Sequence, residues 1–287
     1  MTAAVSVPPV IPSAGVSDGL PPVRFRDLVA AEWIKMRSLR STPWALGFIT
    51  VFVIVCAAGA SYSDYRNFPG MDPETQQARQ FALHDAFPST GYLSLMLVAG
   101  SLGAIAVVSE YSSGMIRTST VAVPARSSLV MAKVTTVTVL WTVLGTVMTL
   151  GSYGVSQLIL GARDVWLPLD RPGTVQALVA SALLAPVSAL IGLGLGFLIR
   201  HSAITMVTTT SVLLLLPSFF ATNKPWSAAV NHAMPVSAWQ GLTQTWGSPA
   251  ELPADRYAPV AEAWAMYAVW PLIAVVLSLL VVQRRDV

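Results

Sequence analysis

Six long apolar stretches dominate this chain of 287 residues. Each contains about 20 consecutive residues without Lys, Arg, Asp or Glu, the length that an α-helix needs to cross the hydrocarbon core of a bilayer. A helix satisfies its own backbone hydrogen bonds, so it is the structure that such a stretch adopts in lipid. We therefore expect six membrane-spanning helices, at about 44–63, 89–108, 134–153, 175–199, 202–220 and 263–282.

The overall composition agrees with this expectation. Hydrophobic residues make up 54% of the chain and charged residues only 11%, whereas soluble domains average about 25% charged residues. Lipid must therefore cover much of the surface, and the expected fold class is an all-α integral membrane protein. Residues 1–23 contain no Lys or Arg and many prolines, and we expect a disordered tail there, followed by one membrane domain over 24–287.

The basic residues between the apolar stretches predict the orientation. If the N-terminus is cytoplasmic, eleven of the 17 Lys and Arg residues fall in cytoplasmic segments. Because cytoplasmic loops carry an excess of Lys and Arg, this is the favoured direction. With six spans, both termini are then cytoplasmic, and the protein is expected in the cell membrane.

The segment before the first span has the pattern of an amphipathic helix over 24–42. Its apolar side chains fall within an arc of about 140°, with basic residues outside that arc, which is typical of a helix lying on the inner leaflet. Glu32 interrupts the apolar arc. Either it pairs with Lys35 one turn later, or it contacts a partner or the next intracellular loop.

Several functional classes are disfavoured by what the sequence lacks. No charged residue lies in the middle of a predicted span, although ion-driven carriers and charged channel filters place such residues there. The three histidines show no metal-binding spacing, and no Lys follows a Gly as a phosphate-binding loop requires. An enzyme, a cofactor in this chain and a nucleic-acid partner are therefore not expected. A nucleotide that drives this protein must be bound by another polypeptide.

The loop between the second and third spans reads "SEYSSGMIRTSTVAVPARSSLVMAK". Glu110 at the end of a helix can form an ion pair with a basic neighbour, Gly114 permits a turn, and Pro124 disfavours helical geometry at the preceding residue. Two interpretations follow. The segment is a short rigid lever at the membrane surface, or it is an ordinary loop whose Arg117, Arg126 and Lys133 only fix the topology.

Three segments together resemble the type-2 permease family, the membrane subunits of ABC-type exporters, especially the six-span permeases of actinomycetes. They are "AEWIKMRSLRSTPW", "LGAIAVVSEYSSGMIRTSTVAVPARSSLVMAK" and "GLGLGFLIRHSAIT". The resemblance extends over roughly 24–287, and the second segment is its most specific part. It implies a six-span permease domain, with ATP and Mg bound by separate ATPase subunits in two copies and with a second copy of the permease.

The resemblance also assigns residues. A coupling helix that docks on the ATPase is implied over 110–124, where the family pattern matches Glu110, Tyr111, Gly114, Ile116 and Arg117. The family's interface helix is implied before the first span, matched by Glu32, Trp33, Lys35 and Arg37.

Threonines follow one side of the third span. Thr135, Thr138, Thr142, Thr146 and Thr149 project within about 80° of one another. They either permit close helix packing and share hydrogen bonds, or line a pathway for an amphipathic substrate. Gly192, Gly194 and Gly196 in the fourth span allow the same two interpretations.

The segment between the fifth and sixth spans, 221–262, is apolar but interrupted by prolines. It predicts short half-helices, either re-entrant or resting on lipid. The uncharged spans favour an apolar or amphipathic cargo. The expected function is that of an exporter permease, and the alternative is a non-transporting membrane protein that binds a ligand, confers immunity or acts as a sensor.

Overall fold

The computed structural model describes residues 24–38, 41–78, 81–115, 126–165, 167–220, 224–243 and 258–284. Within these ranges every regular element is a helix. The predicted tail, 1–23, lies outside the described residues.

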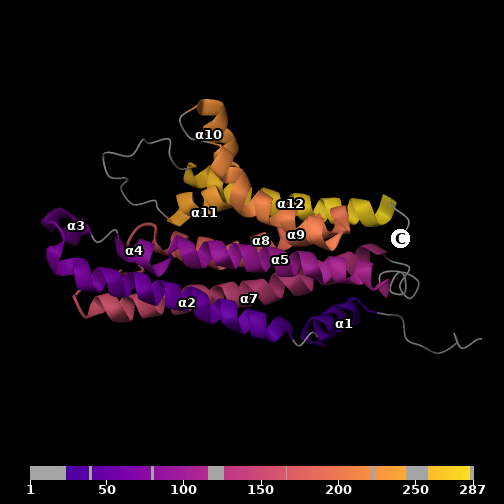
Figure 1. Ribbon diagram of the computed structural model, residues 1–287, viewed down its shortest axis with the longest axis horizontal. Helices are drawn as coiled ribbons and strands as arrows, with labels where there is room; N and C mark the ends of the chain where they lie inside the picture. Colours follow the sequence, from indigo (N-terminus) through magenta and orange to yellow (C-terminus); the bar gives the residue numbers. More distant parts are fainter. Residues whose placement is uncertain are drawn as a thin grey trace, which may run out of the picture.

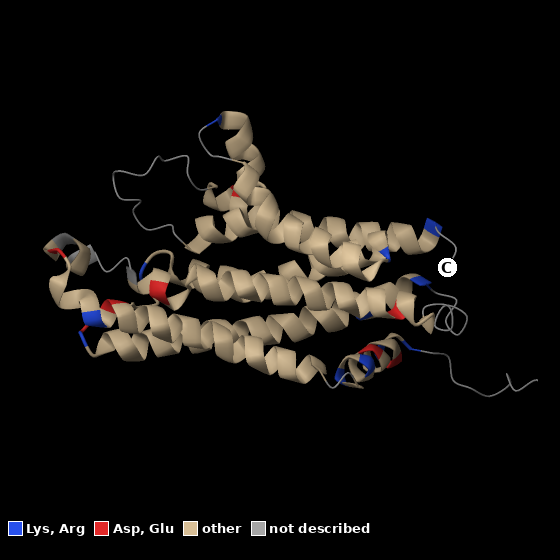
Figure 2. Ribbon diagram, in the orientation of Figure 1, with Lys and Arg blue, Asp and Glu red and all other residues tan. Residues whose placement is uncertain are grey.

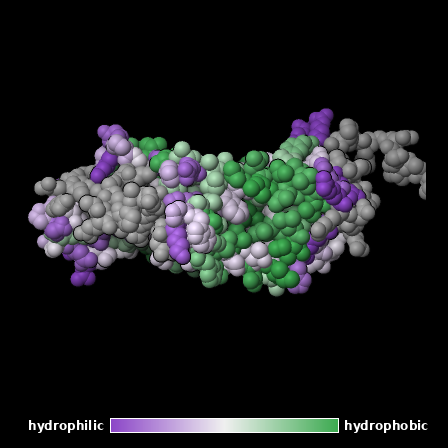
Figure 3. Space-filling model, turned by 90° about the horizontal axis from the view of Figure 1, so that it is seen from above, coloured by the Kyte–Doolittle hydropathy of each residue, from purple (hydrophilic) through white to green (hydrophobic). Residues whose placement is uncertain are grey.

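Six helical segments are long and apolar enough to cross a membrane, which confirms the predicted fold class. They run side by side along the long axis of the molecule (Figure 1). Hydrophobic side chains cover a broad band of the surface seen from above, next to the end that holds the C-terminus (Figure 3). The six are α2 (Ser41–Asn67), α5 (Ser89–Ser112), α7 (Arg126–Gly161), α8 (Thr174–Ile199), α9 (Ser202–Thr210) with its continuation, and α12 (Val260–Arg284).

Several helices are longer than the apolar stretches that predicted them. The third span was expected over 134–153, but α7 begins at Arg126 and continues to Gly161. The polar ends of this helix are as regular as its apolar middle, because a helix that has started gains a hydrogen bond with each added residue. As a result Lys133, expected in a loop, lies two turns inside a helix. In contrast, α1 (Phe25–Ser38) is shorter than the predicted 24–42, and α2 already begins at Ser41.

The fourth span, α8, is the centre of the bundle and packs against α5, α7 and α12. Its closest contact is with α5, where backbone meets backbone. A Cβ added at Gly192 would lie 1.9 Å from the carbonyl oxygen of Gly100, and one at Gly103 would lie 2.0 Å from that of Ala189. Small residues permit such an approach in membranes, so packing explains Gly192.

The fifth span is not one regular helix. α9 passes into a π-helical turn, η2 (Ser211–Leu215), and then into a 3₁₀ turn, η3 (Leu216–Phe219). Pro217 has no N–H to donate, and its ring would clash with the carbonyl of Leu213 in a regular α-helix. The change of helix type therefore has a local cause.

Short helices join the spans at the end of the bundle opposite α1. Between α2 and α5 lie η1 (Phe68–Gly70), α3 (Pro73–Ala78) and α4 (Phe81–Ala86), and between the last two spans lie α10 (Pro225–His232) and α11 (Pro235–Thr243). α10 stands away from the bundle (Figure 1). α11 is buried against α8 and α12. Its Trp239 stacks on Tyr92 of α5 at 5.3 Å, so the lipid-resting interpretation is wrong for α11.

The contact between α5 and α8 predicts a large effect of a single methyl group. In Gly192→Ala the new carbon would overlap a backbone atom that cannot rotate away. We expect this variant to lose about 1–3 kcal/mol of stability through overpacking, measured as a lower midpoint of thermal unfolding in detergent. The control is Gly59→Ala in α2, whose Cβ would meet nothing within 4 Å. Equal midpoints for the two variants would contradict the described contact.

Candidate functional site

Charged side chains gather at the two ends of the bundle and leave the long helices between them free of charge (Figure 2). At the end where α1 lies, four of them meet. Glu32 and Lys35 come from α1, Glu110 from the last turn of α5, and Lys133 from the first half of α7. We call these four residues the charge cluster.

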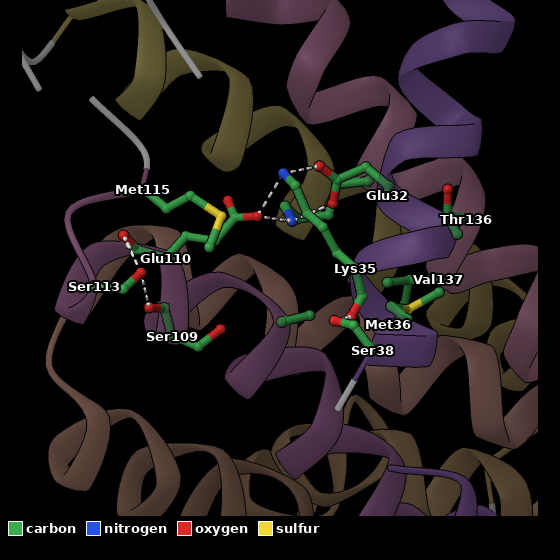
Figure 4. Close-up of a pocket in the computed structure, with 12 residues that line it drawn as sticks. Glu32, Lys35, Met36, Ser38, Ser109, Glu110, Ser113, Met115, Thr136 and Val137 are labelled. Atoms are coloured by element: carbon green, nitrogen blue, oxygen red, sulfur yellow. Dashed lines mark hydrogen bonds and ion pairs between the residues drawn. The ribbon is translucent and has the colours of Figure 1, made fainter. Parts of the chain in front are cut away.

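The cluster alternates in charge, so that each ammonium group touches two carboxylates. Lys35 Nζ lies 2.6 Å from Glu32 Oε1 and 3.0 Å from Glu110 Oε1. Lys133 Nζ lies 2.9 Å from the same Glu110 oxygen and also donates to Glu32 Oε2. Figure 4 shows these contacts converging from three helices. Charge-assisted hydrogen bonds of this kind are the strongest that side chains form.

Three of the four side chains are almost removed from solvent. The exposed fraction is 7% for Glu32, 8% for Lys133 and 11% for Glu110, whereas Lys35 keeps 32%. Taking ions out of water costs several kcal/mol each, and a buried pair recovers this cost only when its geometry is complete. Two positive and two negative charges satisfy that condition together, so the cluster needs all four members.

The charges also stabilise one another's ionised states on α1. Burial favours a neutral Glu32, but the ammonium groups of Lys133 and Lys35 outweigh burial and hold the pKa of its carboxyl below the ordinary 4.5. Burial likewise opposes the charge on Lys35, but its hydrogen bonds to Glu32 and Glu110 outweigh burial and raise its pKa above the ordinary 10.5. Both residues are charged over the whole physiological range.

The position of Glu32 is explained by what α1 packs against. α1 lies on α7, and the side of α1 that carries Leu28 and Glu32 is buried. Glu32 pairs with Lys35, as one of the two explanations from the sequence predicted. It also reaches Lys133, the last residue of the polar stretch between the second and third apolar runs, as the other explanation predicted. Lys133 was interpreted only as a topology signal. Its spacing was a usable signal, because a Lys at the start of an apolar helix and a Glu at the end of the preceding one lie at the same membrane surface.

The residues assigned to the coupling segment begin at the cluster. Glu110 belongs to it, and the ring of Tyr111 lies under the guanidinium of Arg200, with 4.8 Å between the guanidinium carbon and the ring centre. Gly114 has φ +70°, a left-handed conformation that a residue without Cβ adopts at little cost. α5 therefore ends in a defined turn. Ile116 and Arg117 lie outside the described residues.

The remaining interface-helix residues are more exposed. Trp33 is 40% exposed, and Arg37 is exposed as well. Tryptophan and arginine at a membrane surface suit contact with lipid headgroups. The structure thus separates Glu32 and Lys35, which belong to the charge cluster, from Trp33 and Arg37, which are exposed at its side.

A cavity of about 270 Å³ lies beside the charge cluster, between α1, α5 and α7. Its wall is mainly apolar, with Met36, Ala106 and Val137 next to the serines of the α5 end. Figure 4 shows Met115 and Met36 at its margin. Among the residues that the structure describes, no group of three or more His, Cys, Asp or Glu side chains is placed to hold a metal ion.

Comparison with known families identifies the protein family of this chain. The family model described as "ABC-2 family transporter protein" matches residues 28–216, more than half of the chain. The chain belongs to the ABC-2 transporter family. This permease family supplies the membrane component of ABC transporters and works with an ABC ATPase. The matched residues include the whole charge cluster, and with six apolar helices they indicate a multi-pass membrane protein. A comparison with curated proteins gave no match.

The threonine stripe of this permease changes its surroundings along α7. Thr135, Thr138 and Thr142 are half-buried, Thr146 is exposed, and Thr149 is buried. The hydroxyls of Thr135, Thr138 and Thr146 donate to carbonyls one turn earlier in α7, and Thr149 accepts from Tyr92 at 3.4 Å. Thr149 therefore packs helices, and the pathway role of the other four stays a prediction.

The alternation of charge predicts that two substitutions made together lower the stability by less than the sum of their separate effects. Glu110→Gln leaves two ammonium groups with one carboxylate, and Lys133→Met leaves two carboxylates with one ammonium group. Each single change should cost about 3–5 kcal/mol, because it leaves an uncompensated buried charge. The double variant retains the balanced Glu32–Lys35 pair, so its cost should fall at least about 1 kcal/mol below the sum. Thermal unfolding of the purified permease measures all three.

Arg26→Met is the control for this cycle, because the Arg26–Asp27 pair is largely exposed and should be worth about 0–1 kcal/mol. Additive costs in the cycle would show that Glu110 and Lys133 do not depend on each other.

The pKa shifts predict a broad pH range in which α1 stays attached. Glu32, with its lowered pKa, stabilises the folded state above its ordinary 4.5, and this contribution is lost as the pH falls through the folded-state value. Lys35, with its raised pKa, stabilises below its ordinary 10.5, and this contribution is lost as the pH rises through the folded-state value. The distance from α1 to α7 should therefore stay constant between these limits and increase in stronger acid.

This distance can be measured by pulsed electron paramagnetic resonance. The spin labels are placed at two exposed positions, Ile34→Cys and Val139→Cys, in a Cys56→Ala background. A change near neutral pH would contradict the assignment of the cluster as the attachment of α1.

Proposed function

We propose that this chain is the permease subunit of an ATP-driven exporter and that the segment 110–124 couples it to a separate ATPase subunit. The observation that carries the proposal is the charge cluster. It joins the helix before the first span, α1, to the helix that enters the coupling segment, α5, and to the helix that leaves it, α7.

This arrangement suits the transmission of force. A loop that docks on an ATPase moves the spans only if its two ends are held to a common body. Here both ends are held, because Glu110 and Lys133 contact each other and both contact α1. Removing one partner of a buried pair costs about 3–5 kcal/mol, so the connection is strong enough to move as a unit during a conformational change.

The partners follow from this role. Two ATPase subunits bind ATP and Mg and dock at the α1 end of the bundle, and a second copy of the permease completes the assembly. That end is cytoplasmic in our proposal, which places both termini inside and agrees with the excess of Lys and Arg in these segments. The outward-facing Trp33 and Arg37 then meet the headgroups of the inner leaflet.

The cargo is apolar or amphipathic in this proposal. The long helices carry no charge between their ends (Figure 2), so a charged solute would find no group to replace its hydration along them. A molecule with a large apolar part, such as a lipid, a peptide or a hydrophobic natural product, requires no such replacement.

The turn at Gly114 offers a test that leaves the charge cluster intact. Gly114 is exposed, and a Cβ there would meet nothing within 4 Å, so its substitution affects only the backbone conformation. A β-branched residue disfavours positive φ, whereas Asn tolerates it. We expect Gly114→Val to reduce the permease-stimulated hydrolysis of ATP by the co-purified ATPase several-fold, and Gly114→Asn to retain most of it.

Both variants should enter the membrane and unfold at the same temperature as the unmodified protein, which separates a coupling defect from misfolding. Equal ATPase activity in the two variants would contradict the coupling role of the segment. If no ATPase co-purifies from native membranes under mild detergent, the alternative of a non-transporting binding protein is favoured instead.

A further inference from the structure

We propose that Arg200, in the turn between the fourth and fifth spans, is a positioning residue that holds the start of the coupling segment to this turn. Its guanidinium does so by stacking on the ring of Tyr111. The structural part of the proposal is this contact. The mechanical part, that the contact carries motion to the fifth span, rests on the coupling function proposed above.

Arg200 occupies a backbone position that glycine usually takes. It ends α8 with φ +58° and ψ 7°, and its N–H donates to the carbonyl of Gly196 at 3.1 Å, a hydrogen bond typical of helices that end in the left-handed conformation. Among the described residues, Asp164 is the other non-glycine residue with positive φ, and its short polar side chain makes this conformation acceptable. Arginine has no such property. Its presence indicates that the side chain stabilises the turn through a contact elsewhere.

That contact is made with the end of α5. The guanidinium carbon lies 4.8 Å from the centre of the Tyr111 ring, within the distance of about 6 Å at which the face of an aromatic ring attracts a cation. Nε and Nη2 of Arg200 are buried and have no hydrogen-bond partner, and none of the ion pairs in the described part of the chain includes this residue. The ring is therefore the group in this part of the chain that compensates the charge, and its attraction is stronger where water is excluded.

The contact continues the packing of α5 on α8 beyond the apolar part of the two helices. A Cβ added at Gly196 of α8 would lie 3.0 Å from the Cβ of Val107 in α5, so the helices already touch at this level. Arg200 lies one turn after Gly196, and Tyr111 lies one turn after Val107. The stacked pair thus extends the contact by one turn, to the place where both helices end.

Two neighbouring residues give the end of α5 two separate attachments. Successive residues of an α-helix project about 100° apart, so Glu110 and Tyr111 reach different elements. Glu110 contacts α1 and α7 in the charge cluster, whereas Tyr111 contacts the turn that leads into α9. α9 begins at Ser202, only two residues after Arg200. A displacement of the coupling segment therefore reaches the fifth span through Arg200, in addition to α1 and α7 through the cluster.

NMR spectroscopy of the arginine side chains tests the contact directly. In the purified permease with ¹⁵N-labelled arginine, the buried Nε–H of Arg200 should exchange slowly with water, and the ring current of Tyr111 should shift its proton resonance upfield. Arg163 also lies over a ring, that of Tyr65, so the resonance is assigned by its loss in Arg200→Lys. Tyr111→Phe should keep the shift because the ring remains, whereas Tyr111→Leu should abolish it.

Two results would overturn the contact. One is the absence from the unmodified protein of a shifted, slowly exchanging resonance that Arg200→Lys removes. The other is an unchanged shift in Tyr111→Leu. The first result does not depend on whether a variant at Tyr111 folds.

The mechanical part is tested with a variant that keeps the turn. Arg200→Gly retains the left-handed conformation at little cost and removes the side chain. We expect it to reduce the permease-stimulated hydrolysis of ATP by the co-purified ATPase several-fold, and Tyr111→Leu to do the same from the other side of the contact. Tyr111→Phe should retain most of the stimulation. The control is Arg66→Gln, which removes an exposed arginine at the opposite end of the bundle and should leave the stimulation unchanged.

The outcomes separate this proposal from the function on which it rests. Full stimulation in either Arg200→Gly or Tyr111→Leu would overturn the mechanical role of the stacked pair and leave the coupling function intact. An unmodified permease that stimulates no ATPase would contradict the coupling function and with it the mechanical role. The resonance of Arg200 would still decide whether the contact exists.

Discussion

A buried charge needs partners of opposite charge, and this constraint determines the geometry of the α1 end. Glu32, Lys35, Glu110 and Lys133 each touch two groups of opposite charge, so any one of them left alone would be an ion in a poorly hydrated place. α1 also buries Leu28, but the charge cluster is what joins it to both α5 and α7. The position of α1, the end of α5 and the start of α7 are consequently set by one shared electrostatic condition.

The cost of burying an unpaired charge also divides the molecule into regions with different chemistry. Between the two ends, helices meet through glycine, alanine and threonine, and the contact of Gly192 with Gly100 excludes even a methyl group. Some hydroxyl groups there donate to their own backbone, as that of Thr138 does to Val134, and others donate to a neighbouring helix, as that of Tyr92 does to Thr149. Among the described residues, the Lys, Arg, Asp and Glu side chains lie near the ends of the bundle (Figure 2), and the charge cluster satisfies its buried members with opposite charges.

Much of this architecture could be predicted from the sequence. The six spans and the helix before them follow from the length of apolar runs and from helical periodicity, which are local properties. Glu32 was recognised as unusual because it interrupts the apolar arc of an amphipathic helix. Glu110 was recognised because it follows directly on an apolar span. Lys133 was missed as a member of the site. Its place at the start of an apolar helix was a usable signal for the contact with Glu110, but its contact with Glu32 depends on how α1 crosses α7, which no local pattern encodes. The π turn in the fifth span has a local cause in Pro217, but its form depends on the packing around it.

The backbone contact between α5 and α8 has a consequence for how the protein can move. Where Gly103 meets Ala189 and Gly192 meets Gly100, no side chains lie between the helices to change rotamer and absorb a displacement. At these contacts a displacement of one helix is therefore passed directly to the other, because no rotamer change can absorb it. The fifth span is built differently, because η2 and η3 interrupt its regular hydrogen bonding. The bundle thus combines a closely packed pair of helices with an irregular span that can deform more easily.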